Sequence, residues 1–260
     1  GPMVDKFEKK FSKIFLNGKE CVSTGSGTDA LHLAYILAGV KKNDEVITPV
    51  FTCTATNIPL LYIGAKIKFV DLDPNTMNIC IKDLKKKITK KTKAIVCVHY
   101  GGIPCDMDEI KKVAKKYNVK VIEDAAQALG GKYKNQNIGT ISDFTVFSFQ
   151  AIKHITTGDG GMLCIKDKKL NEKAKRIRWF GIDRKKKQLG IWKNDIKEVG
   201  FKYQLTDLGA SIGYQSLIDF KKIISHRQKI YNIYLKNLSK NPKIICVHDY
   251  NPKKKCAAWL

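Results

Sequence analysis

The 260-residue sequence lacks an apolar run near the roughly 18 residues that cross a bilayer, and it lacks a charged start followed by an apolar signal core. We therefore expect a soluble, cytoplasmic protein with no membrane partner. The eight cysteines include no CxxC pair, and several of them lie in apolar, strand-like runs. Reduced thiols are expected in place of a disulfide framework or a zinc site, and no metal site is predicted.

Arginine is scarce although the chain is strongly basic. Lysine and arginine number 48 against 24 acidic residues, a formal charge of +24, yet only residues 176, 178, 184 and 227 are arginine. Arginine is the preferred side chain for bidentate recognition of phosphates and bases, so the charge fits a compositional bias with a solvated lysine surface better than a nucleic-acid site. We expect no nucleic-acid partner, although a positive field favours small phosphorylated ligands.

Short apolar runs alternate with amphipathic segments from about residue 28 to residue 180. Strands are predicted at residues 45–48, 67–72, 94–98, 119–123, 144–147 and 162–165. Helices are predicted between them at residues 28–38, 54–63, 81–88, 107–117 and 168–178. The alternation predicts an α/β fold with a mainly parallel central sheet and helices on both faces.

The pattern changes beyond residue 180. Two helices are predicted at residues 206–219 and 220–238, and a last pair of strands at residues 244–247 and 257–260. This pair would begin a second α/β unit that stops abruptly. We expect a large domain over residues 3–215, and over residues 216–260 the start of a C-terminal small domain that is truncated.

Ligands of an open parallel sheet bind at the carboxyl ends of its strands, so polar and glycine-rich segments there are candidate sites. The first such segment, residues 24–30, comes directly before a helix. Gly27 and Thr28 could bring free N–H groups and the positive end of the helix dipole to an anion. The alternative is a flexible turn in which Ser26 or Thr28 caps the helix.

Two further segments carry a carboxylate and an amine. A buried strand runs into Glu123 and Asp124, and a carboxylate placed there is costly unless it meets a cation or hydrogen-bond donors. Another strand ends at Ser148, and Lys153 follows in an apolar and Thr/Gly-rich setting that could lower its pKa and allow a Schiff base. The alternatives are a helix cap at Asp124 and an ordinary surface lysine.

Together these segments supply an anion cradle, a carboxylate and an amine, which are the groups that pyridoxal 5′-phosphate requires. The sequence resembles the DegT/DnrJ/StrS family, the nucleotide-sugar aminotransferases of the aspartate aminotransferase fold (fold type I). The resemblance lies in residues 26–28, 123–127, 148–153 and 156–161, with further matches at residues 44–49, 98–102 and 200–207. These matches run in order over nearly the whole chain.

The resemblance implies a role for each matching residue. Lys153 matches the lysine that bonds to the cofactor aldehyde and shuttles the proton, and Asp124 matches the carboxylate that keeps the ring nitrogen protonated. Gln127 matches the residue near the ring hydroxyl. The phosphate-binding positions match Gly27, Thr28 and Ser148. The implied reaction transfers an amino group, usually from glutamate, to a keto group of a nucleotide-linked deoxysugar, in homodimers with shared active sites that serve amino-sugar and polysaccharide biosynthesis.

Two positions depart from the family pattern, and one feature bears on which reaction is expected. Cys53 stands where the family usually stacks an aromatic residue on the cofactor ring. Lys202 stands near the position where many members place an asparagine against the cofactor phosphate of the partner subunit. The dehydratases of the family replace the lysine by histidine, so retention of Lys153 favours transamination. The alternatives are a truncated, non-catalytic homologue that binds cofactor or sugar nucleotide, and a pyridoxal-phosphate-dependent sugar dehydratase.

Overall fold

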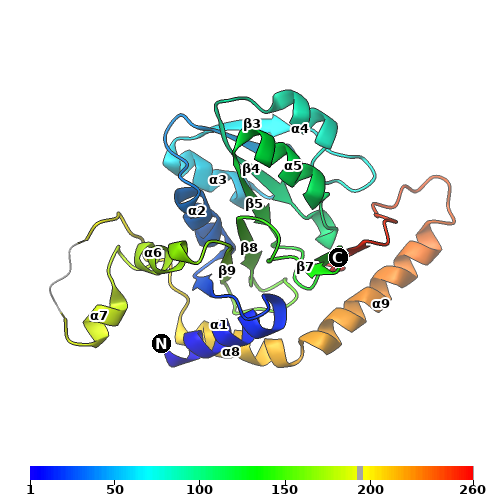
Figure 1. Cartoon of the computed structure of the whole chain (residues 1–260). Coiled ribbons are helices and arrows are strands. Elements are labelled where there is room, and N and C mark those ends of the chain that lie inside the picture. The colour runs from blue at the N-terminus through cyan, green and yellow to red at the C-terminus, as the bar shows by residue number, and fades with distance from the viewer. Residues whose placement is uncertain (192–195, 260) are drawn as a thin grey trace.

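The computed structural model describes residues 1–191 and 196–259, and its centre is a seven-stranded sheet (Figure 1). The strand order is β1-β9-β8-β5-β4-β2-β3. These strands are β1 (Cys21–Thr24), β2 (Glu45–Pro49), β3 (Lys66–Val70), β4 (Thr92–Val98), β5 (Lys120–Asp124), β8 (Phe144–Ser148) and β9 (Gly161–Ile165). The pairs from β3 through β2, β4 and β5 to β8 are parallel, whereas β9 runs antiparallel to both β8 and β1. The predicted mainly parallel α/β sheet is confirmed.

The central strands are buried on both faces. In β4, Ile95 and Cys97 belong to one apolar cluster, whereas Ala94 and Val96 belong to the other. Successive side chains of a strand point to opposite faces, so a continuous apolar run serves two cores at once.

Helices cover each face of this sheet. On one face lie α2 (Gly27–Leu37), α3 (Thr54–Ile63) and α6 (Lys169–Ile177). On the other face lie α1 (Pro2–Phe15), α4 (Ile81–Lys87), α5 (Met107–Tyr117) and α8 (Asp207–Ile218). Both predicted helical layers are therefore present.

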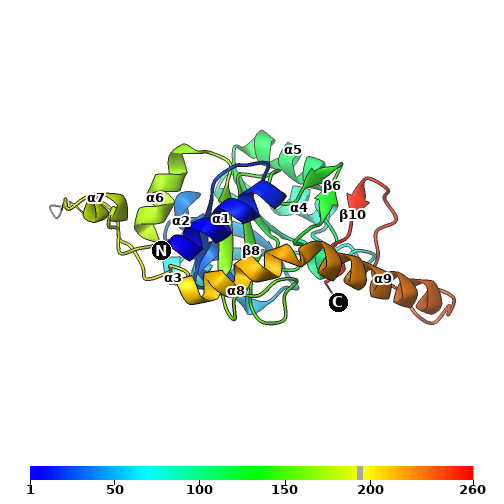
Figure 2. The same cartoon turned by 90° about the horizontal axis from the view of Figure 1, so that it is seen from below.

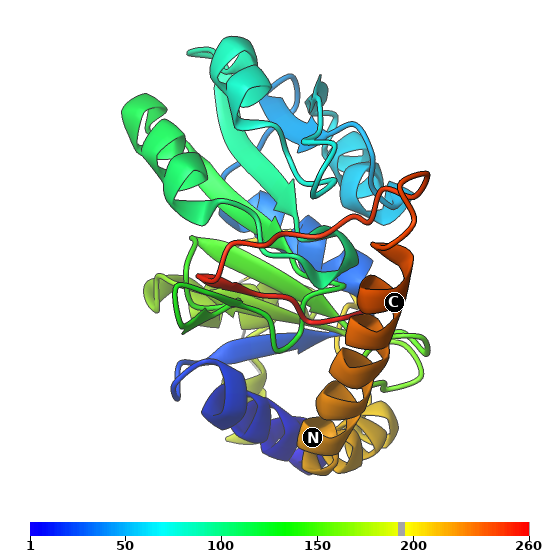
Figure 3. The ribbon, with the colours of Figure 1, turned by 90° about the vertical axis from the view of Figure 1, so that its right-hand side faces the viewer.

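The C-terminal part of the chain extends past the sheet. Helix α8 lies beside α1, and α9 (Phe220–Leu238) continues from it as an arm (Figure 2). The chain then returns across the end of the sheet (Figure 3), where β10 (Lys254–Lys255) joins a small sheet with β6 (Lys132–Tyr133) and β7 (Gln136–Asn137). No helix within the described ranges is both long and apolar enough to span a membrane.

The predicted last pair of strands is wrong. Residues 244–247 form no strand, and β10 lies several residues later. Residues 257–259 form no strand either: the N–H groups of Ala257 and Trp259 donate to the carbonyls of Gly102 and Gly101, which lie in a 3-10 turn and not in a strand. Leu260, the last residue of that prediction, lies outside the described residues. Helix α8 crosses the domain boundary expected after residue 215, and the division into two domains stays a prediction.

The prediction also omits several elements that the structure contains. These are α1, β1, the short strands β6 and β7, a 3-10 turn at Tyr100–Gly102 and the short helix α7 (Arg184–Gln188).

Candidate active site

A cavity of about 360 Å³ opens at the carboxyl ends of the central strands. It brings together all the predicted site residues except Lys202, from four separate segments of the chain. These residues are Gly27, Thr28, Cys53, Asp124, Gln127, Ser148 and Lys153.

The start of α2 forms one wall of the cavity. Ser26 is the N-cap of this helix, and its hydroxyl accepts a hydrogen bond of 3.0 Å from the N–H of Asp29. Within the described part of the chain, the N–H groups of Gly27 and Thr28 have no acceptor. A Cβ at Gly27 would lie 3.0 Å from the Cβ of Ser148, so glycine is what lets the helix start approach the end of β8. Free N–H groups and the helix dipole make this wall suitable for an anion.

Asp124 ends β5 and is 5% exposed. Its Oδ2 accepts a 2.7 Å hydrogen bond from the hydroxyl of Thr56, and its Oδ1 accepts one of 3.1 Å from the N–H of Ala126. Because the Thr56 proton is used in this way, the hydroxyl of Thr52, 2.7 Å from that of Thr56, is the donor of its pair. The buried carboxylate is thus stabilised by two donors, as a charge at this place requires.

Lys153 lies in a turn after β8, where its N–H donates to the carbonyl of Gln150 over 2.9 Å. Burial lowers the pKa of its amine, against the opposing effect of Asp124 and Cys53. A lowered pKa raises the fraction of neutral amine, which is the nucleophilic form. The Nζ atom lies 4.3 Å from the centre of the Trp259 ring, which the C-terminal segment brings to the site.

Gln127 and Cys53 complete the cavity lining. The Gln127 Oε1 accepts a 2.7 Å hydrogen bond from the N–H of Gly101, which fixes the orientation of the amide because only its oxygen can accept. Cys53 is the N-cap of α3 without a side-chain cap bond, and its thiol is exposed. A cysteine here offers a bound ring less contact area than an aromatic residue would.

Glu123, the neighbour of Asp124, does not face the cavity. Its Oε2 lies 2.8 Å from His99 Nε2, and both side chains are fully buried. His99 Nδ1 accepts a bond from the N–H of Cys105, so the ring proton is on Nε2 and is donated to Glu123. Burial raises the pKa of Glu123, but hydrogen bonds from His99, Ser142 and Thr145 outweigh it and leave the pKa lowered.

Lys202 does not line the cavity of its own chain. It forms an isolated bridge with Trp179, on the segment where the carbonyl of Tyr203 accepts a 2.7 Å bond from the N–H of Gly25. Its predicted contact with the phosphate site of a partner subunit stays a prediction.

Two residues that the sequence reasoning did not single out stand close to the reactive groups. Thr56 lies on the first turn of α3. The only sequence signal that could have found it is a hydroxyl side chain three residues after Cys53. Trp259 lies 106 residues beyond Lys153 along the sequence, so no local pattern connects the two.

The site has a lysine of lowered pKa, a buried carboxylate and a helix start suited to an anion, all at the carboxyl end of a mainly parallel sheet. This combination is typical of the α/β class to which the fold type I transferases belong. The chain matches the DegT/DnrJ/EryC1/StrS aminotransferase family over residues 1–260 and belongs to it.

The chain is also similar to curated proteins and to solved structures. An uncharacterized protein of Methanocaldococcus jannaschii is 44% identical over 90% of this chain and 61% of its own length. The GDP-perosamine synthase of Escherichia coli O157:H7 is 40% identical over 100% of this chain and 69% of its own length. The crystal structure of the sugar aminotransferase CalS13 from Micromonospora echinospora superposes with a TM-score of 0.93 at 32% identity, covering 100% of this chain and 71% of that one. The chain thus spans between three fifths and three quarters of the length of these relatives.

The residues present fit pyridoxal phosphate. The unpaired N–H groups of Gly27 and Thr28 suit a phosphate, and a Cβ at Gly27 would crowd the wall that the phosphate would approach. The buried Asp124 carboxylate suits a protonated ring nitrogen, and the Lys153 amine suits an aldehyde.

Proposed function

We propose that this chain carries the active site of a pyridoxal-phosphate-dependent aminotransferase that acts on a nucleotide-linked keto sugar. The amino group would come from an amino acid such as glutamate, and the product would serve amino-sugar and polysaccharide biosynthesis. The observation that carries the proposal is the shared cavity of the partly desolvated Lys153 amine and the buried Asp124 carboxylate. The family assignment indicates pyridoxal phosphate as the cofactor, and the relatives' names support a sugar substrate.

Each residue has a proposed task. Pyridoxal phosphate, when bound, supplies an aldehyde that exchanges amines and a ring that accepts an electron pair. Asp124, held by Thr56, keeps a negative charge against the protonated ring nitrogen. Gly27, Thr28 and Ser148 bind the phosphate. Lys153 would hold the cofactor through its aldehyde carbon, and its Nζ, when neutral, would be the base that takes the proton from the substrate carbon and returns it.

Transamination is favoured over dehydration because the proton carrier is a lysine. His154, the next residue, is 3% exposed and its Nε2 lies 2.9 Å from the carbonyl of Ala257. Burial lowers the pKa of His154 to about 4, and the positive charges of Arg227 and Lys153 add to that effect. It is therefore a neutral donor to the C-terminal segment and does not replace Lys153.

A homodimer with shared sites is part of the proposal. Large apolar side chains are exposed on the segments beside the cavity: Val50 is 56% exposed, Phe51 47%, and Ile152 58%. Exposed apolar side chains gathered beside a cavity are typical of an interface, and Lys202 would reach the phosphate of the second copy there. Function in the cytoplasm stays a prediction.

The direct test is reductive labelling of the purified protein. The wild type with pyridoxal phosphate should absorb visible light, and borohydride should then fix the cofactor on one lysine, which peptide mapping should identify as Lys153. Lys153→Ala should abolish both signals, and Lys41→Ala, which removes an exposed lysine, should retain both. A colourless wild type, or a label spread over many lysines, would contradict the proposal.

A further inference from the structure

The indole ring of Trp259 lies against the Lys153 amine, with Nζ 4.3 Å from the centre of the ring. A positive charge within about 6 Å of an aromatic face is attracted to it, and tryptophan attracts it more strongly than the other aromatic side chains. The ring therefore favours the ammonium form of the amine, whereas burial lowers the pKa of the same amine. These two effects oppose each other at one nitrogen atom.

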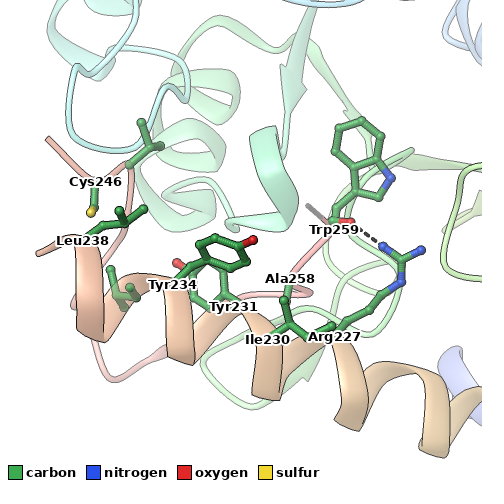
Figure 4. Close-up of a pocket in the computed structure, with 10 residues that line it drawn as sticks. Arg227, Ile230, Tyr231, Tyr234, Leu238, Cys246, Ala258 and Trp259 are labelled. Atoms are coloured by element: carbon green, nitrogen blue, oxygen red, sulfur yellow. Dashed lines mark hydrogen bonds between the residues drawn. The ribbon is translucent and has the colours of Figure 1, made fainter. Parts of the chain in front are cut away.

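The backbone around Trp259 is held in an uncommon conformation. One N–H group of Arg227, on α9, donates to the Trp259 carbonyl, and the indole points away from that helix (Figure 4). On the other side, the Trp259 N–H donates to the carbonyl of Gly101 over 3.4 Å. The preceding residue, Ala258, is buried and has a φ of 50°, in the left-handed region that residues other than glycine rarely adopt. Such a conformation persists only where its surroundings hold it, and it often occurs at functional positions.

The other groups near Lys153 do not bind its amine directly. Asp124 and Cys53 favour the charged amine through their own charges, and His154 is neutral because burial lowers its pKa to about 4. Among residues 1–191 and 196–259, the Nζ atom makes no hydrogen bond and no ion pair. The Trp259 ring is therefore the contact that positions the amine.

We propose that Trp259 is a positioning residue that holds the Lys153 amine, as an ammonium, whenever the amine is not bonded to the cofactor. The inference rests on the proposed function, in which the Nζ lone pair takes a proton from the substrate carbon and later returns it. A base is positively charged once it has taken the proton, so a contact that favours this charge acts on the proton transfer and not on substrate binding. Burial keeps part of the amine neutral before that step, and the ring stabilises the ammonium that the step forms.

The test is competitive labelling of the cofactor-free protein with acetic anhydride, which reacts with the neutral amine. It compares the wild type with Trp259→Phe, Trp259→Leu and Tyr214→Leu, and mass spectrometry of peptides follows the labelling of Lys153 against pH. The midpoint of this curve reports the balance between ammonium and amine, whereas the plateau at high pH reports access of the reagent. Trp259 Nε1 has no hydrogen-bond partner in the described part of the chain, so Trp259→Phe removes no hydrogen bond to that part.

Loss of the ring should move the midpoint to lower pH. At a fixed pH below the midpoint, the neutral fraction of Lys153 should be about 2- to 30-fold higher in Trp259→Leu than in the wild type, with Trp259→Phe in between. Tyr214→Leu is the matched control, because Lys10 Nζ lies 4.2 Å from the centre of the Tyr214 ring and neither residue lines the cavity. It should shift the curve of Lys10 and leave that of Lys153 unchanged. If the indole only excludes water, its removal raises the midpoint of Lys153, so a raised or unchanged midpoint overturns the inference.

A second measurement follows the spectral change that glutamate causes in the protein loaded with pyridoxal phosphate. Trp259→Leu should lower the limiting rate about two- to fivefold, because the rate follows base strength only in part, and should leave the half-saturating concentration unchanged. A raised half-saturating concentration at the wild-type rate would make Trp259 a substrate contact, and the inference would be wrong. A wild type that takes up no cofactor defeats the proposed function itself, whereas the labelling curves still decide whether the ring holds the amine.

Discussion

Replacing Thr56 by valine tests how the site holds its buried carboxylate. The valine keeps the shape of the side chain but removes the hydroxyl that donates to Asp124 over 2.7 Å in a position with no solvent exposure. Water cannot replace the lost donor there. Hydrogen bonds to a charged group contribute about 1.5–3 kcal/mol, so the free energy of unfolding should fall by about that amount. For a chain of this size that corresponds to a melting temperature about 3–12 °C lower.

The neighbouring hydroxyl supplies the control. Thr52 donates to Thr56 and not to the carboxylate, so Thr52→Val removes a bond between neutral groups that contributes about 0.5–1.5 kcal/mol. Thermal denaturation should rank Thr56→Val below Thr52→Val, and spectral titration with pyridoxal phosphate should show the same order of affinity. If the two variants melt together, or if Thr52→Val is the less stable, Thr56 does not support Asp124 as argued.

Two other predictions concern the walls of the cavity. His154 has a folded pKa of about 4 against an ordinary value of 6.5, so between these values the unfolded chain binds an extra proton and the folded state loses stability as the pH falls. His154→Gln keeps the donor to Ala257 but cannot titrate, so from pH 6.5 to pH 4 its free energy of unfolding should fall by up to about 3 kcal/mol less than that of the wild type. Denaturant titrations at several pH values measure this difference, and parallel curves for the two proteins would refute the prediction. Gly27→Ala places a methyl group 3.0 Å from the Ser148 Cβ and so should push the start of α2 away from the end of β8. In a spectral titration, pyridoxal phosphate should therefore bind at least about fivefold more weakly. Unchanged affinity would show that the phosphate lies elsewhere.

The sequence predicts the strands of the sheet well because their apolar runs are local signals. The runs around Ile95 and Val121 are buried on both faces and bounded by turns, which is what a parallel strand needs. Helix α1 is absent from the prediction although Phe7, Phe11 and Phe15 recur every fourth residue on its buried face. The predicted strand at residues 244–247 is wrong because an apolar run forms a strand only where a neighbouring strand accepts its hydrogen bonds.

The candidate site also has residues that the sequence predicts and residues that it does not. Motif residues such as Gly27, Asp124 and Lys153 stand beside strand ends and glycine turns, so the sequence alone places them at one edge of the sheet. Thr56 and Trp259 could not be found in that way, because their contacts depend on how a helix and a distant tail pack against that edge.

The adjacent carboxylates of β5 show why one residue of such a pair is structural and the next is available to a ligand. Neighbouring side chains of a strand point to opposite faces, so Glu123 and Asp124 cannot share one environment. Glu123 is enclosed by donors from His99, from Ser142 just before β8 and from Thr145 on β8, and its charge is fully used within the protein. Asp124 has donors too, but it also lines the cavity. The charge that remains available to a cationic group in the cavity is therefore that of Asp124, and the His99–Glu123 pair fixes the strand end that presents it.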